Sequence, residues 1–365
     1  MKTLQVERLR LQGFRSYAAL DLALPDGTCA FIGGNAQGKT NLLEAIYLCC
    51  VGRSHRTAHD QELVMLGCEQ GTVLVDYLNT YGRGSVEMRL QAHGRKQILV
   101  NDTSVRRMAD LYGHVCCVMF SPEDLALVKQ GPSMRRRLVD IALSQAQPAY
   151  FHSLQTYNRI LTQRNALLKT PRQAPATLFV WDEQLAVAGQ DVSERRAVFI
   201  EQLSGPAGQL HADIANETLG MAYAPNQPNF SKEAMLEALH QSRGADLARG
   251  STSVGPHRDD IALTVQGRDA RVYASQGQQR TVALALKIAE LCVLRDCIGQ
   301  WPLLLLDDVL SELDAKRRHA LLTLLPQVQV LVSGTELGGL EQAPVTAFSV
   351  ANGSISPSFP HQPTV

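Results

Sequence analysis

The sequence predicts an α/β fold in which a mixed sheet with an antiparallel meander carries a phosphate-binding loop and is interrupted by an inserted, mainly helical domain. Three patterns support this prediction. An apolar run at 29–32 leads into a glycine-rich loop that is followed by a helical pattern. Apolar residues alternate, as in half-buried strands, between 72 and 100 and again after 260. Between 122 and 250 they recur at helical spacing instead.

The first part of the chain is expected to be rich in strands. Alternation at 3–11 and 18–24 precedes the turn Pro25-Asp26-Gly27, and a third strand then enters the glycine-rich loop. The helix after the loop should run to about residue 50. Turn residues join the next strands in a meander rather than a βαβ series, and a buried strand follows at 114–120. The meander strands are expected at 72–78, 85–91 and 96–100.

The predicted helical domain begins where Ser121 offers an N-cap and Pro122 suits the first turn. The chain is therefore expected to divide into an N-terminal half of the ATPase domain at 1–121, a helical domain at 122–250, and a C-terminal half of the ATPase domain at 251–365. In the last part, strands are expected at 260–266, 271–274, 303–307, 328–333 and 346–350.

The glycine-rich loop matches the pattern G-x-x-x-x-G-K-[ST] between a strand and a helix. Glycines let successive backbone N–H groups converge on phosphate oxygens at the helix N-terminus. Lys39 would reach the β- and γ-phosphates, and the Thr40 hydroxyl would ligate Mg²⁺. The alternative is a glycine-rich turn with an exposed lysine. ATP contacts are expected from Gly33, Gly34, Asn35, Ala36, Gln37, Gly38, Lys39 and Thr40.

Composition narrows the possible partners. The 365 residues contain 35 Lys+Arg and 35 Asp+Glu, so any contact with nucleic acid must come from a local basic patch. The 8 cysteines lack C-x-x-C spacing, which suits a reducing cytosol and does not suggest a zinc site. The N-terminus lacks the apolar region of a signal peptide, and no stretch is long and apolar enough to span a membrane. A cytoplasmic protein without a membrane partner is expected.

A second half of the nucleotide site is expected near residue 307. The apolar run LLLL ends in Asp307, as a buried strand would that delivers a carboxylate to Mg²⁺ opposite Thr40. Asp308 is placed to orient or deprotonate the attacking water. Together with Lys39, these are the expected catalytic residues. The alternative is that Asp307 and Asp308 only cap the end of a strand.

A hydroxyl and a glycine also stand at the start of the helical run that begins near residue 276. The pattern S-x-G-Q, with Ser275, Gly277 and Gln278, resembles the signature motif of the ABC ATPase superfamily. That resemblance implies an ABC/SMC-like P-loop ATPase head. It also implies that the signature motif acts in trans, on ATP held by a second copy in an ATP-dependent homodimer. Ser311 and Asp314 resemble the D-loop of the same superfamily.

Within that superfamily, two groups fit less well. Transporter ATPase subunits, the alternative function, usually carry a Glu where this chain has Asp308, and chromosome-maintenance ATPases carry a far longer coiled-coil insertion. The chain resembles the RecF family of bacterial recombination mediators most closely. The stretches that carry this resemblance are GFRSY (13–17), GRSHRT (52–57), FSPEDLALVKQGPSMRRRLVD (120–140), YNRILTQRNALLK (157–169), GPHRDD (255–260), SQGQQR (275–280) and LLLLDDVLSELD (303–314).

The resemblance implies a cytoplasmic DNA-repair protein with ATP and Mg²⁺ as cofactors and a weak ATPase that serves as a switch. It implies binding to double-stranded, gapped or single-stranded DNA, and cooperation with RecO and RecR in loading RecA. It also suggests that Arg15 contacts the nucleotide, although a surface role is an equal alternative. Whether Glu123 or Asp124 replaces the Q-loop glutamine is open, as is the role of His257-Arg258-Asp259-Asp260.

Arginines are the candidates for DNA contact, because they would position duplex phosphates without reading sequence. Each one alone is better explained as part of a solvated face. The candidates are Arg53, Arg56, Arg106, Arg107, Arg135, Arg136 and Arg137.

Overall fold

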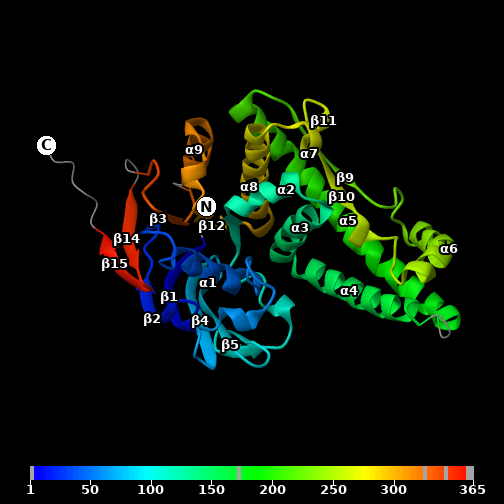
Figure 1. The fold of residues 1–365 in the computed structure, drawn as a ribbon, viewed down its shortest axis with the longest axis horizontal. Helices are drawn as coiled ribbons and strands as arrows, with labels where there is room; N and C mark the ends of the chain where they lie inside the picture. Colours follow the sequence, from blue (N-terminus) through cyan, green and yellow to red (C-terminus); the bar gives the residue numbers. More distant parts are fainter. Residues whose placement is uncertain (1–3, 171–173, 324–326, 341–343, 359–365) are drawn as a thin grey trace. The chain divides into compact units, whose positions relative to one another are not determined.

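The computed structural model describes residues 4–170, 174–323, 327–340 and 344–358 (Figure 1). It divides into two compact units. The first unit combines residues 1–124 with 287–365, and the second consists of residues 125–286. Within the described ranges, no helix has both the length and the apolarity that a bilayer crossing requires.

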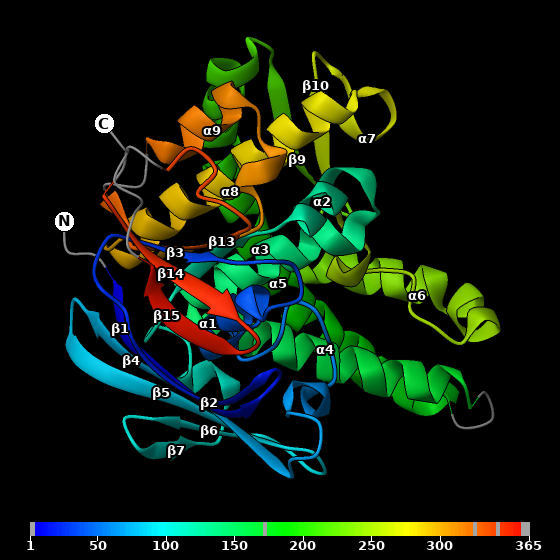
Figure 2. The same cartoon turned by 60° about the vertical axis from the view of Figure 1, so that its left-hand side comes forward.

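An antiparallel meander forms one layer of the first unit, as expected (Figure 2). Its strand order is β2-β1-β4-β5-β6-β7, and every neighbouring pair is antiparallel. Alternate residues of β4 and β5 are buried, which matches the period of a strand with one covered face. The strands are β1 Gln5–Phe14, β2 Tyr17–Ala23, β4 Gln70–Asn79, β5 Gly82–Gln91, β6 Gln97–Val100 and β7 Thr103–Val105.

A second, mostly parallel sheet carries the phosphate loop. Its order is β15-β14-β3-β13-β12-β8, and only the pair of β14 and β15 is antiparallel. The carboxyl ends of the parallel strands meet at one edge of such a sheet, where ligands bind in open α/β folds. The strands are β3 Thr28–Ile32, β8 Cys117–Phe120, β12 Leu303–Asp307, β13 Val330–Gly334, β14 Val345–Ala351 and β15 Ser354–Ser358.

Helix α1, Lys39–Val51, explains how the two sheets share one core. It contacts β12 and β13 of the parallel sheet as well as β4 and β5 of the meander. Nearly all of its side chains are therefore buried, and apolar residues surround it on every side. The other helices that lie within this unit are the short η1 Asp60–Leu63, η2 Met108–Asp110 and η5 Leu310–Glu312, and α9 Ala315–Leu322.

The second unit is mainly helical. Its longest helix, α5, has 42 residues and is thus about 63 Å long at 1.5 Å per residue. Figure 1 shows α4 lying beside it. A small sheet, β11-β10-β9, belongs to the same unit. Its elements are α2 Ala126–Lys129, α3 Pro132–Ala146, α4 Pro148–Leu168, α5 Ala174–Ala215, β9 Leu219–Ala224, α6 Lys232–Arg249, η4 Pro256–Arg258, β10 Asp260–Val265, β11 Arg268–Asp269 and α7 Ala270–Tyr273. Two elements cross the unit boundaries, η3 Pro122–Leu125 and α8 Gln276–Ile298.

Two differences from the sequence prediction concern the end of the helical unit. The helical unit continues to residue 286 rather than 250, because β9 pairs along its length with β10 and so ties residues 260–265 to that unit. The strand expected at 271–274 is helix α7 instead. The Asp269 carboxylate accepts from the backbone N–H groups of Arg271 and Val272, and such an N-cap starts a helix.

Candidate functional site

The phosphate loop is a tight turn between β3 and α1. Gly38 has a φ of 107° and precedes the first residue of α1. A Cβ on Gly33 would lie 2.2 Å from the backbone carbonyl oxygen of Val350, so no side chain fits there. Both positions therefore require glycine, for backbone conformation at Gly38 and for close approach of another strand at Gly33.

Neighbouring elements hold this loop in place. The Tyr17 hydroxyl donates to the Gly38 carbonyl at 3.2 Å, and burial raises the pKa of Tyr17, so the phenol stays protonated. The backbone N–H of Asn352 donates to Gln37 Oε1 at 2.7 Å. The loop is thus fixed by β2 on one side and by the turn between β14 and β15 on the other.

Lys39 lies across the loop that it follows. Its ammonium donates to the carbonyl oxygens of Gly33 at 2.7 Å and Gly34 at 2.6 Å, and the residue is only 8% exposed. A lysine carries three donors, so it can bind a phosphate oxygen in addition to or in place of these carbonyls. Its position fits the expected role at the β- and γ-phosphates.

Thr40 and Asp307 meet at the carboxyl edge of the parallel sheet. The Thr40 hydroxyl donates to Asp307 Oδ1 at 2.8 Å, and the Ser333 hydroxyl donates to the same oxygen at 2.6 Å. Asp307 is 6% exposed. A hydroxyl and a carboxylate are oxygen ligands of the kind Mg²⁺ prefers when it keeps several waters and shares a substrate's phosphates. In the described part of the chain, no cluster of three or more His, Cys, Asp and Glu offers a denser site. The residues present therefore fit a magnesium ion held jointly with nucleotide.

Asp308 faces the loop from the end of β12. Its backbone has a φ of 54°, a left-handed conformation that is uncommon for residues other than glycine. Its N–H donates to the hydroxyl and carbonyl oxygens of Ser333, both at 3.1 Å. The resulting pocket has a volume of about 320 Å³. It is lined by Asn35, Ala36, Gln37, Gly38, Lys39, Thr40, Asn41, Arg56, Asp308 and Ser333.

Two arginines near the pocket lie differently from expectation. Arg15 donates through Nε and Nη2 to both oxygens of buried Glu44, at 2.9 and 2.8 Å, and does not line the pocket. Burial would raise the pKa of Glu44, but hydrogen bonds from Arg15 and Ser54 outweigh it and lower that pKa. Arg56, a candidate for DNA contact, does line the pocket, and its Nη1 donates to Asn41 at 3.2 Å. Of the two, Arg56 is the better placed to meet a nucleotide.

The signature residues lie at the start of α8, in the second unit. Ser275 and Gln278 form a reciprocal capping box: the Gln278 N–H donates to Ser275 Oγ at 3.2 Å, and the Ser275 N–H donates to Gln278 Oε1 at 2.8 Å. Gly277 lies in the first turn between them. The structure does not bring these residues among those that line the pocket of the same chain.

The D-loop residues continue from Asp308 in the first unit. The Ser311 hydroxyl donates to the Asp308 carbonyl at 3.0 Å, and Asp314 caps helix α9 by accepting from the Arg317 N–H at 3.0 Å.

Just before the helical unit, Asp124 accepts from the Ser121 N–H at 2.8 Å, and burial raises the pKa of Asp124. Asp124 therefore has a structural role, whereas Glu123 is exposed.

The three arginines of α3, which are candidates for DNA contact, are buried or half-buried, and one of them needs correction. Arg135 is 6% exposed and donates to both oxygens of Asp260, at 2.8 and 2.9 Å, and to two backbone carbonyls. It is a buried structural residue and does not reach a partner. Arg136 donates to the Asp259 carbonyl at 2.5 Å, and burial lowers its pKa. Arg137 is half-buried.

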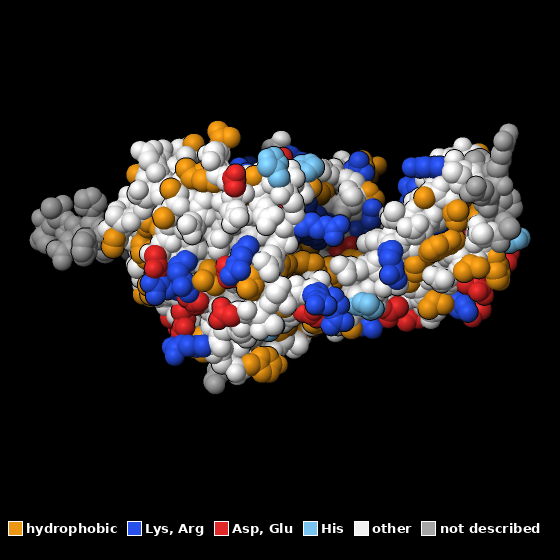
Figure 3. Space-filling model, turned by 90° about the horizontal axis from the view of Figure 1, so that it is seen from below, with side chains coloured by type: hydrophobic (Ala, Val, Ile, Leu, Met, Phe, Trp, Pro, Cys, Tyr) orange, Lys and Arg blue, Asp and Glu red, His pale blue; other side chains and the backbone are white. Residues whose placement is uncertain are grey.

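Four of the candidates are exposed: Arg53, Arg56, Arg106 and Arg107. Arg107 is paired with Asp110 at 2.9 Å and Arg56 lines the nucleotide pocket, so Arg53 and Arg106 are the exposed candidates with neither role. Figure 3 shows the Lys and Arg side chains of one face in separate groups, several of them beside acidic side chains.

The segment 255–260, whose role the sequence left open, is a hub of the helical unit. The Asp259 carboxylate accepts from the Tyr223 hydroxyl, and from the Asn226 N–H at 2.7 Å, and lies 3.7 Å from Arg196. Arg196 also donates to Asp140 of α3 and to the Pro256 carbonyl, the latter at 2.7 Å. These buried contacts join α3, α5, β9 and β10, so the segment is structural.

His257 belongs to this hub, and its surroundings predict that the stability of the fold depends on pH. Its Nε2 must donate to the Thr252 carbonyl at 3.0 Å, since a carbonyl only accepts, and its Nδ1 then accepts from the Tyr157 hydroxyl at 2.7 Å. Burial lowers the pKa of His257 from 6.5 to about 4. Between these values the unfolded state binds a proton that the folded state does not. The free energy of unfolding should therefore fall by up to about 1.4 kcal/mol per pH unit as the pH drops from 6.5 to 4.

Urea unfolding of wild type and His257→Gln at several pH values measures this slope. The variant should unfold more easily at pH 7 and should show a smaller loss of stability down to pH 4. Equal slopes in the two proteins would show that His257 does not titrate as described.

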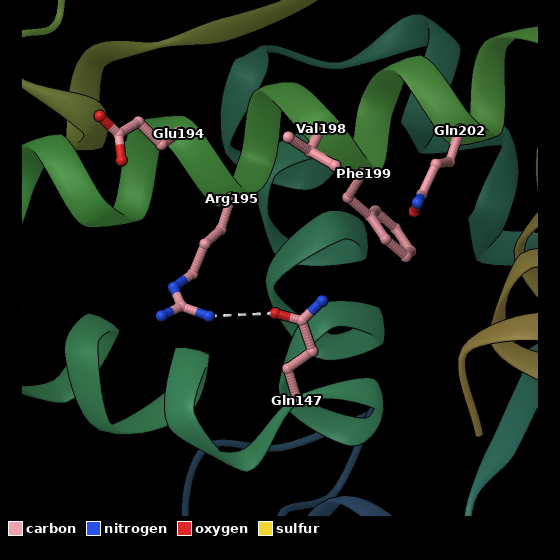
Figure 4. Close-up of a pocket in the computed structure, with 6 residues that line it drawn as sticks. All are labelled: Gln147, Glu194, Arg195, Val198, Phe199 and Gln202. Carbon is pink, nitrogen blue, oxygen red and sulfur yellow. Dashed lines mark hydrogen bonds between the residues drawn. The ribbon is translucent and has the colours of Figure 1, made fainter.

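A further pocket of about 200 Å³ lies on the helical unit (Figure 4). Five residues of α5 line it together with Gln147, at the junction of α3 and α4. Arg195 Nη1 donates to Gln147 Oε1 at 3.2 Å across it. The side chains are Glu194, Arg195, Val198, Phe199 and Gln202, and neither a phosphate loop nor a set of metal ligands is among them. It offers no alternative nucleotide site.

Comparison with known proteins gives a consistent result. A family model described as "RecF/RecN/SMC N terminal domain" matches residues 5–352. The chain is 42% identical over 345 residues to the DNA replication and repair protein RecF of Alkaliphilus oremlandii, which covers 92% of this chain and 94% of that protein.

Solved structures agree. A structure described as "the recombination mediator protein RecF-ATP in RecFOR pathway" is similar with a TM-score of 0.91 and 33% identity, over 98% of each chain. The Smc head domain of Pyrococcus furiosus is similar in fold alone, with a TM-score of 0.57 and 14% identity over 97% of this chain and 96% of that one.

Proposed function

Because the chain belongs to the RecF family, we propose that it is an ATP-gated DNA-binding switch that acts as a recombination mediator in DNA replication and repair. It binds ATP with Mg²⁺, pairs with a second copy, and in that form binds double-stranded and gapped DNA. Its hydrolysis of ATP is weak and resets the switch. Its partners are RecO and RecR, with which it helps to load RecA, and it works in the cytoplasm.

One observation carries the nucleotide part of this proposal. Lys39, Thr40 and Asp308 line one pocket at the carboxyl edge of the parallel sheet, and buried Asp307 adjoins it through a hydrogen bond of 2.8 Å from Thr40. The residues come from sequence positions more than 260 apart, yet they provide a cation, a hydroxyl and two carboxylates around one loop. That set matches the parts that phosphoryl transfer needs.

The residues divide the work of hydrolysis as follows. Lys39 exchanges its carbonyl partners for β- and γ-phosphate oxygens. Thr40 and Asp307 would hold Mg²⁺, which when bound would neutralise charge that develops on the phosphates. Asp308 accepts a hydrogen bond from the attacking water, whose oxygen bonds to the γ-phosphorus as the bond to ADP breaks. The proton leaves the water through Asp308 or the phosphate.

The signature motif completes the site in trans. Ser275 and Gly277 approach the γ-phosphate bound by the other chain, so each of two nucleotides is held by both copies. The Ser311 hydroxyl of the D-loop donates to the Asp308 carbonyl, and this hydrogen bond supports a role for the D-loop in coupling pairing to the residue that orients water. Binding energy from two shared nucleotides then favours the paired state, and hydrolysis removes it.

DNA binding is tested by salt titration. Binding of the ATP-bound protein to duplex and to gapped duplex is measured by anisotropy at several salt concentrations. If Arg53 and Arg106 each contact a phosphate, the double substitution Arg53→Gln, Arg106→Gln should reduce the salt slope by about 2, because each contact contributes roughly 0.9. Arg89→Gln is the control, since Arg89 is exposed but paired with Glu87 at 2.6 Å.

Three results would change the proposal. An unchanged slope in the double variant would place the DNA contact elsewhere on the protein. An equal reduction by Arg89→Gln would indicate a general effect of charge. Failure of the wild type to bind DNA with ATP would favour a scaffold that uses ATP only for assembly.

A further inference from the structure

The Gln278 side chain of the signature motif is bound on both sides by groups of its own chain. Its carbonyl oxygen Oε1 accepts from the Ser275 N–H at 2.8 Å, so its amide nitrogen points away from that group. The amide Nε2 donates to both oxygens of Glu217, at 2.9 and 3.1 Å. A neighbouring carboxylate therefore binds the amide group that the resemblance assigns to the partner's ATP.

Glu217 is presented on a firmly held turn between α5 and β9. Buried His211 donates from Nδ1 to the Glu217 carbonyl at 3.1 Å, the only direction possible for a carbonyl partner. The backbone of the next residue, Thr218, accepts from the Gln266 N–H at 2.9 Å. The Asn216 N–H donates to the Ala212 carbonyl at 2.8 Å. The backbone that bears the carboxylate is thus held by the fold, and the carboxylate itself is held by its two contacts with Gln278.

The end of α8 that Glu217 supports is accessible. Ser275 and Gln276 are exposed, and Val272 and Tyr273, just before them, are 67% and 66% exposed. Glu217 is connected to the Ser275 N–H through the Gln278 amide group alone. At that range, within the Debye length of about 10 Å in 0.1 M salt, its negative charge acts on any anion that approaches Ser275.

We infer that Glu217 is a positioning residue that sets the strength of the ATP-bound pair, an inference that rests on the proposed function. As a hydrogen-bond acceptor it holds Gln278, and through Gln278 it holds the capping box in the shape that receives the γ-phosphate. As a carboxylate it opposes the approach of that phosphate. The two effects have opposite signs, and different substitutions separate them.

Self-association is measured by sedimentation velocity with Mg²⁺ and the non-hydrolysable analogue AMP-PNP. Glu217→Gln keeps the acceptor and removes the charge, so the pair should become tighter by about fivefold at low salt. Glu217→Ala removes both, so the capping box loosens and the pair should weaken by about tenfold. The gain in Glu217→Gln should shrink as salt is added, which loss of a purely structural contact would not cause.

The control is Asp213→Asn, which removes an exposed carboxylate near the end of α5 that bonds only to Gln209 in the contacts described, at 2.8 Å. Its self-association should equal that of the wild type. A Glu217→Gln pair no tighter than the wild type would overturn the inference, as would a Glu217→Ala pair of wild-type strength. Absence of AMP-PNP-dependent pairing in the wild type would instead overturn the proposed function, and nucleotide binding to each chain, measured by equilibrium dialysis, separates the two cases.

Discussion

Lys39→Ala should abolish nucleotide-dependent pairing of the chain. The ammonium is the only cation that the structure places across the phosphate loop among the residues that line the pocket, apart from exposed Arg56. Two charge-assisted hydrogen bonds to phosphate are worth about 3 kcal/mol or more, so the affinity for MgATP should fall by a factor of at least about 100. Equilibrium dialysis measures the affinity, and sedimentation velocity with ATP measures the pairing.

A control distinguishes this loss from general damage. Lys129→Ala removes an exposed lysine at the end of α2 and should bind and pair as the wild type does. The thermal midpoint of Lys39→Ala without nucleotide should stay close to that of the wild type. If Lys39→Ala pairs with ATP at wild-type affinity, the mechanism in which the loop senses the triphosphate is wrong.

Arg164→Met should destabilise the helical unit strongly. Arg164 is fully buried and donates to Asp182 of α5 at 2.7 Å and to Asp246 of α6 at 2.8 Å. Removing the arginine leaves buried carboxylates with less compensation, which costs about 3–5 kcal/mol. Arg195→Met, by contrast, breaks a half-exposed pair with Asp191 at helical spacing and should cost no more than about 0.5 kcal/mol.

The two tryptophans allow each unit to be followed separately. Trp181 lies in α5, and Trp301 lies in the first unit. In a Trp301→Phe background, urea unfolding followed by fluorescence reports the helical unit alone. Equal losses for Arg164→Met and Arg195→Met would show that the buried cluster does not hold the helices together.

The local motifs of the site could be read from sequence because backbone chemistry dictates them. The apolar run before Gly33 and the helical pattern after Lys39 are confirmed as β3 and α1, and the apolar run before Asp307 is β12. Membership of the RecF family also agrees with the ordered motifs and removes the basis for a transporter subunit. These patterns depend only on residues that are close together in the chain, so they can be recognised from the sequence alone.

Contacts between distant segments were not predictable in the same way. The three arginines of α3 look like a basic patch, but Arg135 finds its partner in Asp260, 125 positions away. Likewise, no sequence pattern near Arg15 predicts its hydrogen bonds to Glu44. Gly52 could have predicted part of the Arg56 position, because a glycine that ends α1 in a left-handed conformation indicates that the following chain, which includes Arg56, turns back. Strand β9 was missed because Leu219–Ala224 alternates for only six residues between long helices.

The hydrogen bonds inside the pocket have a consequence for the kinetics of loading. Lys39 is paired with the loop carbonyls, and Asp307 accepts from the hydroxyls of Thr40 and Ser333, so these groups of the site have partners within the chain itself. When MgATP binds, it therefore replaces existing hydrogen-bond partners and does not have to order a disordered loop, so binding costs little reorganisation energy. Nucleotides should accordingly associate quickly with the site, and differences in affinity among them should arise from their dissociation rates.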